Sequence, residues 1–549
     1  MTRRPDARLA ALALGCALFA HGFAAAATGA AAATPWPTSG WEVATPESQG
    51  VAPLALAELV DFGAANDMDS LLVVRHGRIV AEATYAPFRP GLRHAVNSVT
   101  KAIVGTLVGI AVDRGTIRVD EPVLAAFTER NIANVDARKR GLTIGDLLDM
   151  RSGMEWREPL SEAPPESLLA MERSSDWIDF ILDRPMAHPP GQTFNYDSGD
   201  WHLLSAILGR RTPADTEDYA RRMLFAQLGI RDARWRRDPQ GIPIGGYGVF
   251  LEPRDMAKIG YLLLHRGEWA GQQIVSRAWT ERVFAASVDM GFGTTPAFRY
   301  GRGWWTIPEK HVAMAVGFLR QLIIVLPDLD VVVVATGRKN YRVLPLIDRI
   351  VAAAVSAAPL PDDAAARARL AGRIEAAATE EASAVAPASP LAREISGRRW
   401  SLDPNVLGLA AITFDLGDSD PRVAVEVGNA ASAQRQRITA RIGLDGLFRQ
   451  TEIAGGLAGG LVLAVKGSWR DDRTFDLVVR SLTEGIVRSY AFVFSGDEVE
   501  VSSTSNLGPP AVVRGHRNDQ RSSHCAGGRA RCYGVARAGA RVPNRRVPT

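Results

Sequence analysis

Ser98 and Lys101 are the pair of residues whose types and spacing point most directly to chemistry. They stand three positions apart at the start of an apolar run that extends over residues 102–112. Side chains three apart share a helix face, and a helix that is apolar all round is buried. Burial favours the neutral form of a lysine, and a neutral amine beside a hydroxyl can remove its proton. The pattern therefore predicts a serine nucleophile with a lysine base.

A tyrosine after a Pro-Gly turn is the second candidate group. Tyr196 and Ser198 lie in the segment Pro190-Gly191-Gln192-Thr193-Phe194-Asn195-Tyr196-Asp197-Ser198-Gly199-Asp200, which precedes an apolar helix predicted over 201–208. A tyrosine on a loop beside a Ser/Lys pair can pass a proton to a leaving group. The alternatives are a solvated surface Ser/Lys pair and a core tyrosine with a hydrogen-bonded hydroxyl. A Ser-His-Asp triad is not predicted, because no histidine has an aspartate partner at an informative position.

Strands near both ends of one long unit must position these groups. Residues 71–74 and 79–81 predict one hairpin, and residues 322–325 and 331–334 predict another. The chain between them has mainly helical patterns, including a stripe over 254–265. Residues 37–358 are therefore predicted to form an α/β (α+β) domain, in which an antiparallel sheet is closed by the two chain ends and carries a helical insertion.

The remainder of the chain divides into three further segments. Residues 359–390, rich in Ala, Glu and Pro, predict a helical arm and linker. Residues 391–514 contain short alternating segments separated by Gly and Asp, which predict a small antiparallel β-barrel or sandwich. Residues 515–549 predict a disordered basic tail. Since the candidate catalytic groups all precede this β-domain, the sequence predicts that it is dispensable for the chemistry.

The N-terminus has the pattern of an export signal. Three arginines precede an apolar, alanine-rich run over residues 9–27, with small-residue cleavage options after it. Residues 1–33 are therefore predicted to be a cleaved signal peptide, and the mature protein periplasmic or secreted. A membrane anchor and lipidation at Cys16 are the alternatives. No later run reaches the ~18 apolar residues of a spanning helix, so no stable membrane span is expected after cleavage.

Composition excludes several classes of partner. The 549-residue chain has a formal net charge of +4 and no basic stripe with interleaved aromatic residues, so nucleic acid is not an expected partner. The three cysteines, Cys16, Cys525 and Cys532, fall in the predicted signal and tail, which leaves no disulfide scaffold, zinc cluster or thiol nucleophile. No metal or organic cofactor is expected. The oligomeric state is left open.

Taken in order along residues 40–355, these motifs resemble the serine hydrolases related to class C β-lactamases and penicillin-binding proteins, especially their 6-aminohexanoate-dimer-hydrolase-like and esterase branch. Besides Ser98-x-x-Lys101 and Tyr196-x-Ser198, the matching phrases are Leu147-Leu148-Asp149-Met150-Arg151-Ser152-Gly153-Met154, Gly245-Gly246-Tyr247-Gly248, Pro253-Arg254-Asp255-Met256 and Tyr300-Gly301-Arg302-Gly303-Trp304-Trp305. The resemblance implies a β-lactamase/transpeptidase-like fold followed by a lipocalin-like β-domain. It also implies that Ser98 is acylated, Lys101 is its general base and Tyr196 protonates the leaving group.

The resemblance implies further site residues with less support from the residues themselves. The family's Lys/His-Thr-Gly motif matches Ala315-Val316-Gly317, so the amides of Phe318 and Ser98 would form the oxyanion hole. A shifted register, Phe318-Leu319-Arg320, is the alternative. Ser198 stands where class C enzymes carry Asn, and Trp305 is a candidate for the pocket wall.

The sequence therefore predicts a serine hydrolase that cleaves a small ester or amide. Ala315 replaces the cation that would hold a substrate carboxylate, which argues against β-lactams and wall peptides as preferred substrates. The alternatives are a D-alanyl carboxypeptidase acting on wall peptides and a catalytically weak binding protein that acts through its β-domain.

Overall fold

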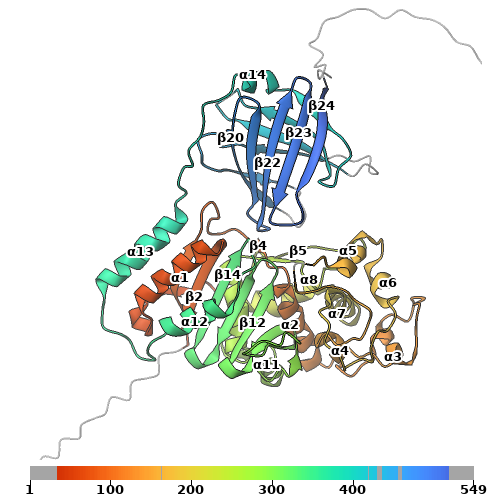
Figure 1. Ribbon diagram of the computed structural model, residues 1–549. Coiled ribbons are helices and arrows are strands. Elements are labelled where there is room, and N and C mark those ends of the chain that lie inside the picture. Colours follow the sequence, from red (N-terminus) through yellow and green to blue (C-terminus); the bar gives the residue numbers. More distant parts are fainter. Residues whose placement is uncertain (1–33, 162, 418, 429–435, 455–459, 519–549) are drawn as a thin grey trace, which may run out of the picture.

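The computed structural model describes residues 34–518 except for 162, 418, 429–435 and 455–459. They form an α/β domain and an all-β domain joined by a helical arm (Figure 1). The predicted signal peptide, the three cysteines and most of the predicted tail lie outside these residues. Among the described residues, no helix is long and apolar enough to cross a membrane.

Among the described residues, nine strands form the central sheet, in the order β1-β3-β2-β14-β13-β12-β11-β10-β9. Both predicted hairpins are present, as β2–β3 and β13–β14, and β2 pairs with β14 so that strands from the two ends of the domain meet inside the sheet. The strands are β1 (Glu42–Val43), β2 (Met68–Arg75), β3 (Arg78–Thr84), β9 (Val288–Asp289), β10 (Arg299–Gly301), β11 (Trp304–Ile307), β12 (Val312–Gly317), β13 (Gln321–Leu326) and β14 (Val331–Gly337).

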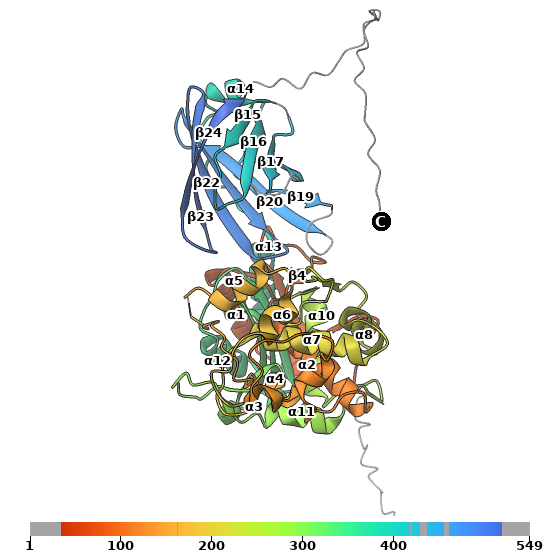
Figure 2. The same ribbon diagram turned by 90° about the vertical axis from the view of Figure 1, so that its right-hand side faces the viewer.

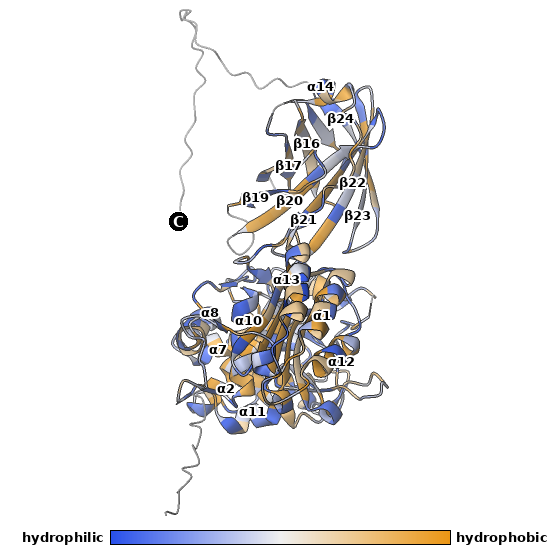
Figure 3. Ribbon diagram, turned by 90° about the vertical axis from the view of Figure 1, so that its left-hand side faces the viewer, coloured by the Kyte–Doolittle hydropathy of each residue, from blue (hydrophilic) through white to orange (hydrophobic). Residues whose placement is uncertain are grey.

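Each face of this sheet is covered by helices, because the strands carry apolar side chains on both faces (Figure 3). One face packs against α1 (Pro53–Ala65) and α12 (Leu344–Ala353), with α13 (Ala364–Ala378) beside α1. The other packs against α2 (Val99–Asp113) and α10 (Pro253–Leu264). Alternation along β12 sends Ala315 toward the α2 side and Met314 toward the α1 side.

The helical insertion that the sequence predicts between the two hairpins is present and lies beyond α2. It comprises α3 (Ala137–Arg140), α4 (Ile144–Leu148), α5 (Glu166–Arg173), α6 (Trp177–Leu182), α7 (Ser198–Arg211), α8 (Thr216–Ala220) and α9 (Ala226–Leu228). Thr143 caps α4 through a reciprocal pair of hydrogen bonds with Asp146, the capping box. The remaining elements of the domain are α11 (Arg277–Phe284), the small sheet of β4 (His94–Ala95), β5 (Arg234–Trp235) and β6 (Val249–Leu251), and the hairpin β7 (Glu268–Trp269)–β8 (Gln272–Gln273).

The C-terminal domain follows α14 (Leu391–Ile395) and is a curled antiparallel sheet that forms a near-barrel (Figure 2). A bridge from Gly443 to Lys466 helps to close it. Its strands are β15 (Arg399–Leu402), β16 (Leu409–Asp415), β17 (Arg422–Val427), β18 (Gln436–Arg441), β19 (Arg449–Ile453), β20 (Leu461–Trp469), β21 (Thr474–Ser481), β22 (Ile486–Ser495), β23 (Glu498–Ser505) and β24 (Ala511–Asn518). The last strand runs to Asn518, past the boundary at 514 that the sequence predicts.

Candidate active site

The helix α2 places Ser98 and Lys101 on one face at the edge of the domain core. The helix begins at Val99, directly after Ser98, and nearly all of its residues are buried. Asn97, the residue before Ser98, has a left-handed backbone with φ of 48°. Lys101 lies on the first turn, and its side chain is 1% exposed. A lysine is buried this completely only where other groups satisfy its amine.

Three oxygen atoms surround the amine of Lys101. Its Nζ lies 3.1 Å from Ser98 Oγ, 3.1 Å from Ser198 Oγ and 2.8 Å from the carbonyl oxygen of Gly246. Burial lowers the pKa of Lys101 to about 8, against the opposing charges of Glu158 and Asp197. A neutral amine has two hydrogens and one lone pair, so it can donate to Gly246 and Ser198 while it accepts the proton of Ser98.

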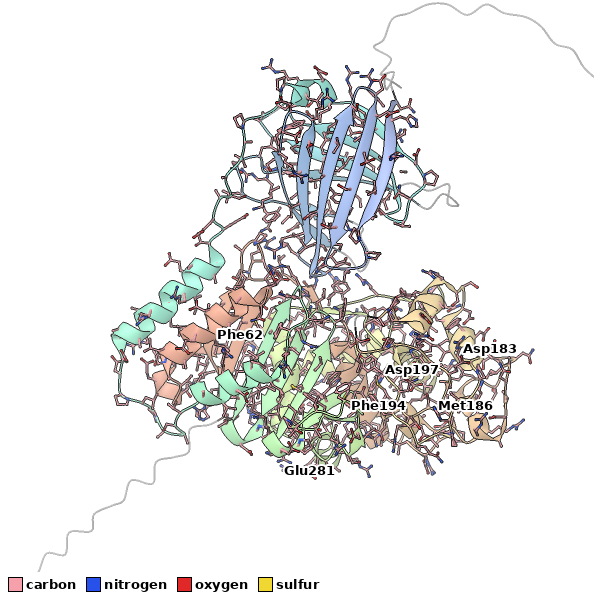
Figure 4. The ribbon with its side chains drawn as sticks, in the orientation of Figure 1. Phe62, Asp183, Met186, Phe194, Asp197 and Glu281 are labelled. Atoms are coloured by element: carbon pink, nitrogen blue, oxygen red, sulfur yellow. The ribbon has the colours of Figure 1, made fainter. Side chains whose placement is uncertain are left out.

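Tyr196 lies beside this pair, in the segment that leads into α7. Its ring centroid is 4.8 Å from Lys101 Nζ, and its side chain is 8% exposed. Burial raises the pKa of its hydroxyl, and a hydrogen bond with Ser98 offsets only part of this rise. The hydroxyl is therefore neutral and holds a proton that it can give to a departing group. Figure 4 labels Phe194 and Asp197, which flank Tyr196 in the sequence, near α7.

Glu158 is a site residue that the sequence analysis did not identify. Its carboxylate accepts hydrogen bonds from the backbone N–H of Ser198 at 2.8 Å, from Ser198 Oγ at 2.7 Å and from Trp156 Nε1 at 2.8 Å. Because the Ser198 hydroxyl donates to Glu158, its oxygen is left to accept from Lys101. Forty residues separate Glu158 from Ser198, and no motif or periodicity links them.

Two buried aspartates at the start of α7 add to the electrostatics of the site. Asp197 caps the helix by accepting from the N–H of Asp200 at 3.1 Å. Burial raises the pKa of Asp197 to about 8, with a further contribution from Glu158, and burial together with Asp197 raises the pKa of Asp200 well above its usual value. A protonated aspartate carries no charge, so these residues add less negative potential at Lys101 than their number suggests.

The end of β12 lies against the segment that enters Ser98. Asn97 Nδ2 donates to the carbonyl oxygen of Phe318 at 3.0 Å. A Cβ atom at Gly317 would lie 2.4 Å from the carbonyl oxygen of Val96, so this approach requires glycine. Within the described chain, neither the N–H of Ser98 nor that of Phe318 has a hydrogen-bond acceptor. Two backbone donors on adjacent segments are thus available to an oxyanion.

The structure distinguishes the two registers considered for the third motif. β12 ends at Gly317, and residues 318–320 form the turn into β13. The register Ala315-Val316-Gly317 therefore lies on the strand, whereas Phe318-Leu319-Arg320 does not. Ala315 is buried on the α2 side and supplies no charge. Arg320 donates from Nε to the carbonyl oxygen of Tyr341.

The side chain of Trp305 packs against the core clusters on both faces of the sheet. It pairs with Met314 across β11 and β12, and paired residues share a sheet face. Met314 faces the α1 side. The ring neighbours of Trp305 are Phe292 and Phe298. Its place in the pocket wall stays a prediction from the family resemblance. In the part of the chain that the structure describes, no cluster of three or more His, Cys, Asp or Glu could hold a metal ion.

The fold, with its buried lysine against a serine, is that of a serine hydrolase of the β-lactamase/penicillin-binding class. The Beta-lactamase family matches residues 58–371, more than half of the chain, and the chain belongs to this family. The resemblance stated from the sequence is thereby confirmed.

Individual relatives agree with this placement. The chain is 29% identical over 285 residues to the 6-aminohexanoate-dimer hydrolase of Paenarthrobacter ureafaciens, covering 48% of this chain and 71% of that protein. It is 30% identical over 181 residues to penicillin-binding protein 4 of Amycolatopsis lactamdurans, covering 33% and 43%. A solved structure from Bacillus anthracis, assigned as a 6-aminohexanoate-dimer hydrolase, has a TM-score of 0.50 and 20% identity over 59% of this chain and 89% of that one; it shows the fold alone.

Proposed function

We propose that the protein hydrolyses a small ester or amide through an acyl-Ser98 intermediate. The observation that carries this proposal is the buried amine of Lys101, 3.1 Å from Ser98 Oγ, with its pKa lowered toward neutrality. An amine in this state accepts the serine proton as Oγ attacks the substrate carbonyl. Neither metal nor organic cofactor is needed for this step.

The neighbouring groups supply the rest of the reaction. The oxyanion formed by the attack accepts hydrogen bonds from the N–H groups of Ser98 and Phe318. When the tetrahedral intermediate collapses, the leaving group takes a proton from Tyr196, which recovers one from the Lys101 ammonium. Water then attacks the acyl carbonyl, and its proton passes to Lys101. Release of the acid returns the proton to Ser98.

Substrate preference follows from what the site lacks and from its relatives. Ala315 offers no positive charge for a substrate carboxylate, so neutral esters and amides fit this site better than β-lactams. The similarity to an enzyme named for an amide dimer of 6-aminohexanoate supports amide cleavage. The similarity to a penicillin-binding protein keeps a D-alanyl carboxypeptidase as the second candidate. A weak binding protein that acts through its β-domain remains the third.

The proposed setting is the periplasm or the exterior of the cell, after removal of residues 1–33. The proposal rests on the arginine-led apolar run at the N-terminus of the sequence.

Turnover of chromogenic substrates tests the proposal. We expect p-nitrophenyl acetate and butyrate to be cleaved far faster than nitrocefin or benzylpenicillin, and we expect Ser98→Ala to be inactive while it remains folded. Nitrocefin turnover equal to ester turnover would favour the penicillin-binding alternative. Ester turnover in Ser98→Ala within tenfold of that of the unaltered protein would contradict the nucleophile assignment.

A further inference from the structure

The turn between β21 and β22 of the C-terminal domain reaches the strand that leads into Ser98. The carbonyl oxygen of Thr483, in this turn, accepts a hydrogen bond of 2.7 Å from the N–H of Ala95. Ala95 belongs to β4 and precedes Ser98 by three residues. In Figure 1, the lower end of β22, where the strand leaves this turn, lies above β4 and β14. The β-domain thus contacts the backbone that carries the proposed nucleophile.

The same turn is linked by hydrogen bonds to Phe318, the proposed oxyanion donor that follows β12. Asn506 Nδ2 donates to the carbonyl oxygens of Gly485 and Arg338, both at 2.8 Å. Arg338 directly follows Gly337 at the end of β14. Gln321 Nε2 donates to the carbonyl oxygens of Gly337 at 2.9 Å and Phe318 at 3.2 Å. A chain of hydrogen bonds, continued by the one peptide link between Gly337 and Arg338, therefore runs from the turn to Phe318.

Buried charges fix this contact between the domains. Asp69 of β2, which is 1% exposed, accepts from Arg480 Nη2 of β21 at 2.9 Å. His94 Nε2 lies 3.2 Å from the other oxygen of the same carboxylate, and Arg338 Nη1 lies 3.5 Å from the first. The surrounding contact is apolar, with Phe88, Leu92, Val462, Ala464 and Leu482 in one cluster. Separating the domains would break the buried pair of Arg480 with Asp69, which is costly, and would leave this carboxylate with His94 and Arg338 of its own domain.

We propose that the β-domain is a positioning element of the hydrolase site. It acts through the turn 482–485, which holds both the backbone that enters Ser98 and the end of β12 that leads into Phe318. The inference rests on the proposed function, because it assigns Ser98 and Phe318 their roles. It runs against the expectation from the sequence that this domain is dispensable. The turn residues touch no reacting atom; they set the relative position of the two backbone donors.

A pair of glycine substitutions tests this role in the full chain. A Cβ atom at Gly485 would lie 2.6 Å from the carbonyl oxygen of Gly337 and 3.2 Å from His94 Cε1, so Gly485→Ala wedges the two domains apart. Gly496 has the same left-handed backbone, with φ of 61° against 67°, in the turn between β22 and β23, and its Cβ would meet nothing within 4 Å. Gly496→Ala therefore controls for backbone strain without touching the catalytic domain.

The measurement is kcat per active site on p-nitrophenyl acetate, with sites counted by fluorophosphonate titration. Counting sites removes the effect of partial unfolding, which a merely structural role would produce. We expect Gly485→Ala to lower kcat per site by about tenfold to a hundredfold with KM within about twofold, as for a small misplacement of catalytic groups. Gly496→Ala should stay within about twofold of the unaltered protein in both values.

Asn506→Ala keeps the test decisive if Gly485→Ala does not fold. Asn506 is exposed, and its amide bridges the domains. Its matched control is Asn405→Ala, because Asn405 also donates to two carbonyls, but only within the β-domain. Asn506→Ala should lower kcat per site and Asn405→Ala should not. Equal kcat per site within each pair, with Ser98→Ala inactive, would refute the positioning role alone. Turnover in Ser98→Ala would refute the proposed function and this inference with it.

Discussion

The pH dependence of acylation gives the sharpest test of the lysine base. The pKa of Lys101 is lowered from 10.5 to about 8. This difference corresponds to roughly 3 kcal/mol. At pH 7, roughly one Lys101 side chain in ten is then neutral, compared with roughly one in three thousand for an unperturbed lysine. Because the neutral amine is the reactive form, the rate should rise with pH and level off above about pH 8.

Single-turnover kinetics can follow this directly. Acylation by p-nitrophenyl acetate is measured by stopped flow from about pH 6 to pH 10, and the background reaction is subtracted with Ser98→Ala. A midpoint near 8 supports Lys101 as the base. A midpoint near that of a free lysine, or a profile unchanged in Lys101→Ala, would refute the reasoning.

Removing the charge of Glu158 tests independently in which direction neighbouring charges shift the pKa of Lys101. The negative charge of Glu158 opposes the lowering of the Lys101 pKa, so Glu158→Gln should move the midpoint of the same profile to lower pH. The control is Glu172→Gln, because Glu172 accepts from the hydroxyl of Tyr247 at 2.7 Å and is not among the groups that shift Lys101. A midpoint that rises in Glu158→Gln would contradict the electrostatic account.

Three further outcomes are expected. Tyr196→Phe should slow acylation by ~10²–10⁴-fold, since it removes a positioned proton donor; stopped-flow rates unchanged in the variant would exclude that role. Ala315→Lys should raise nitrocefin acylation modestly by adding a cation beside the oxyanion strand, and no change in rate would show that this position does not face the carboxylate. Gly109→Ala should lower the free energy of unfolding by ~1–3 kcal/mol, because its Cβ would lie 2.6 Å from Trp279 Nε1. Gly372→Ala on α13, whose Cβ would meet nothing within 4 Å, should raise the free energy of unfolding. Thermal unfolding that ranks the two variants the other way would refute the packing argument.

Local patterns were sufficient to predict the elements that carry the site. The apolar run after Lys101 predicts the buried helix α2, and the valine-rich segments around 331–334 predict β14. Spacing of three residues predicts the Ser98–Lys101 contact, because it lies within one helical turn. The family resemblance adds the order of the motifs, and with it the fold.

Contacts between residues far apart in the sequence could not be predicted in this way. Glu158 contacts Ser198, which lies forty residues further along the chain. Among the described residues, the only hydrogen-bond partner of Glu158 nearby in the sequence is Trp156, two positions earlier. Trp304 and Trp305 are adjacent in sequence, so only the pairing of β11 with β12 decides which of them faces α2. The contact of Thr483 with Ala95 joins two domains that the composition of the linker suggests are independent.

Labelling with a fluorophosphonate probe tests the central claim most directly. The intact protein is treated with the probe near pH 8, close to the pKa of Lys101, and the modified peptide is located by mass spectrometry. We expect a single label on Ser98, lost in Ser98→Ala and strongly slowed in Lys101→Ala. A label on another serine, or no label on a protein that hydrolyses p-nitrophenyl acetate, would contradict the assignment of Ser98 as the nucleophile.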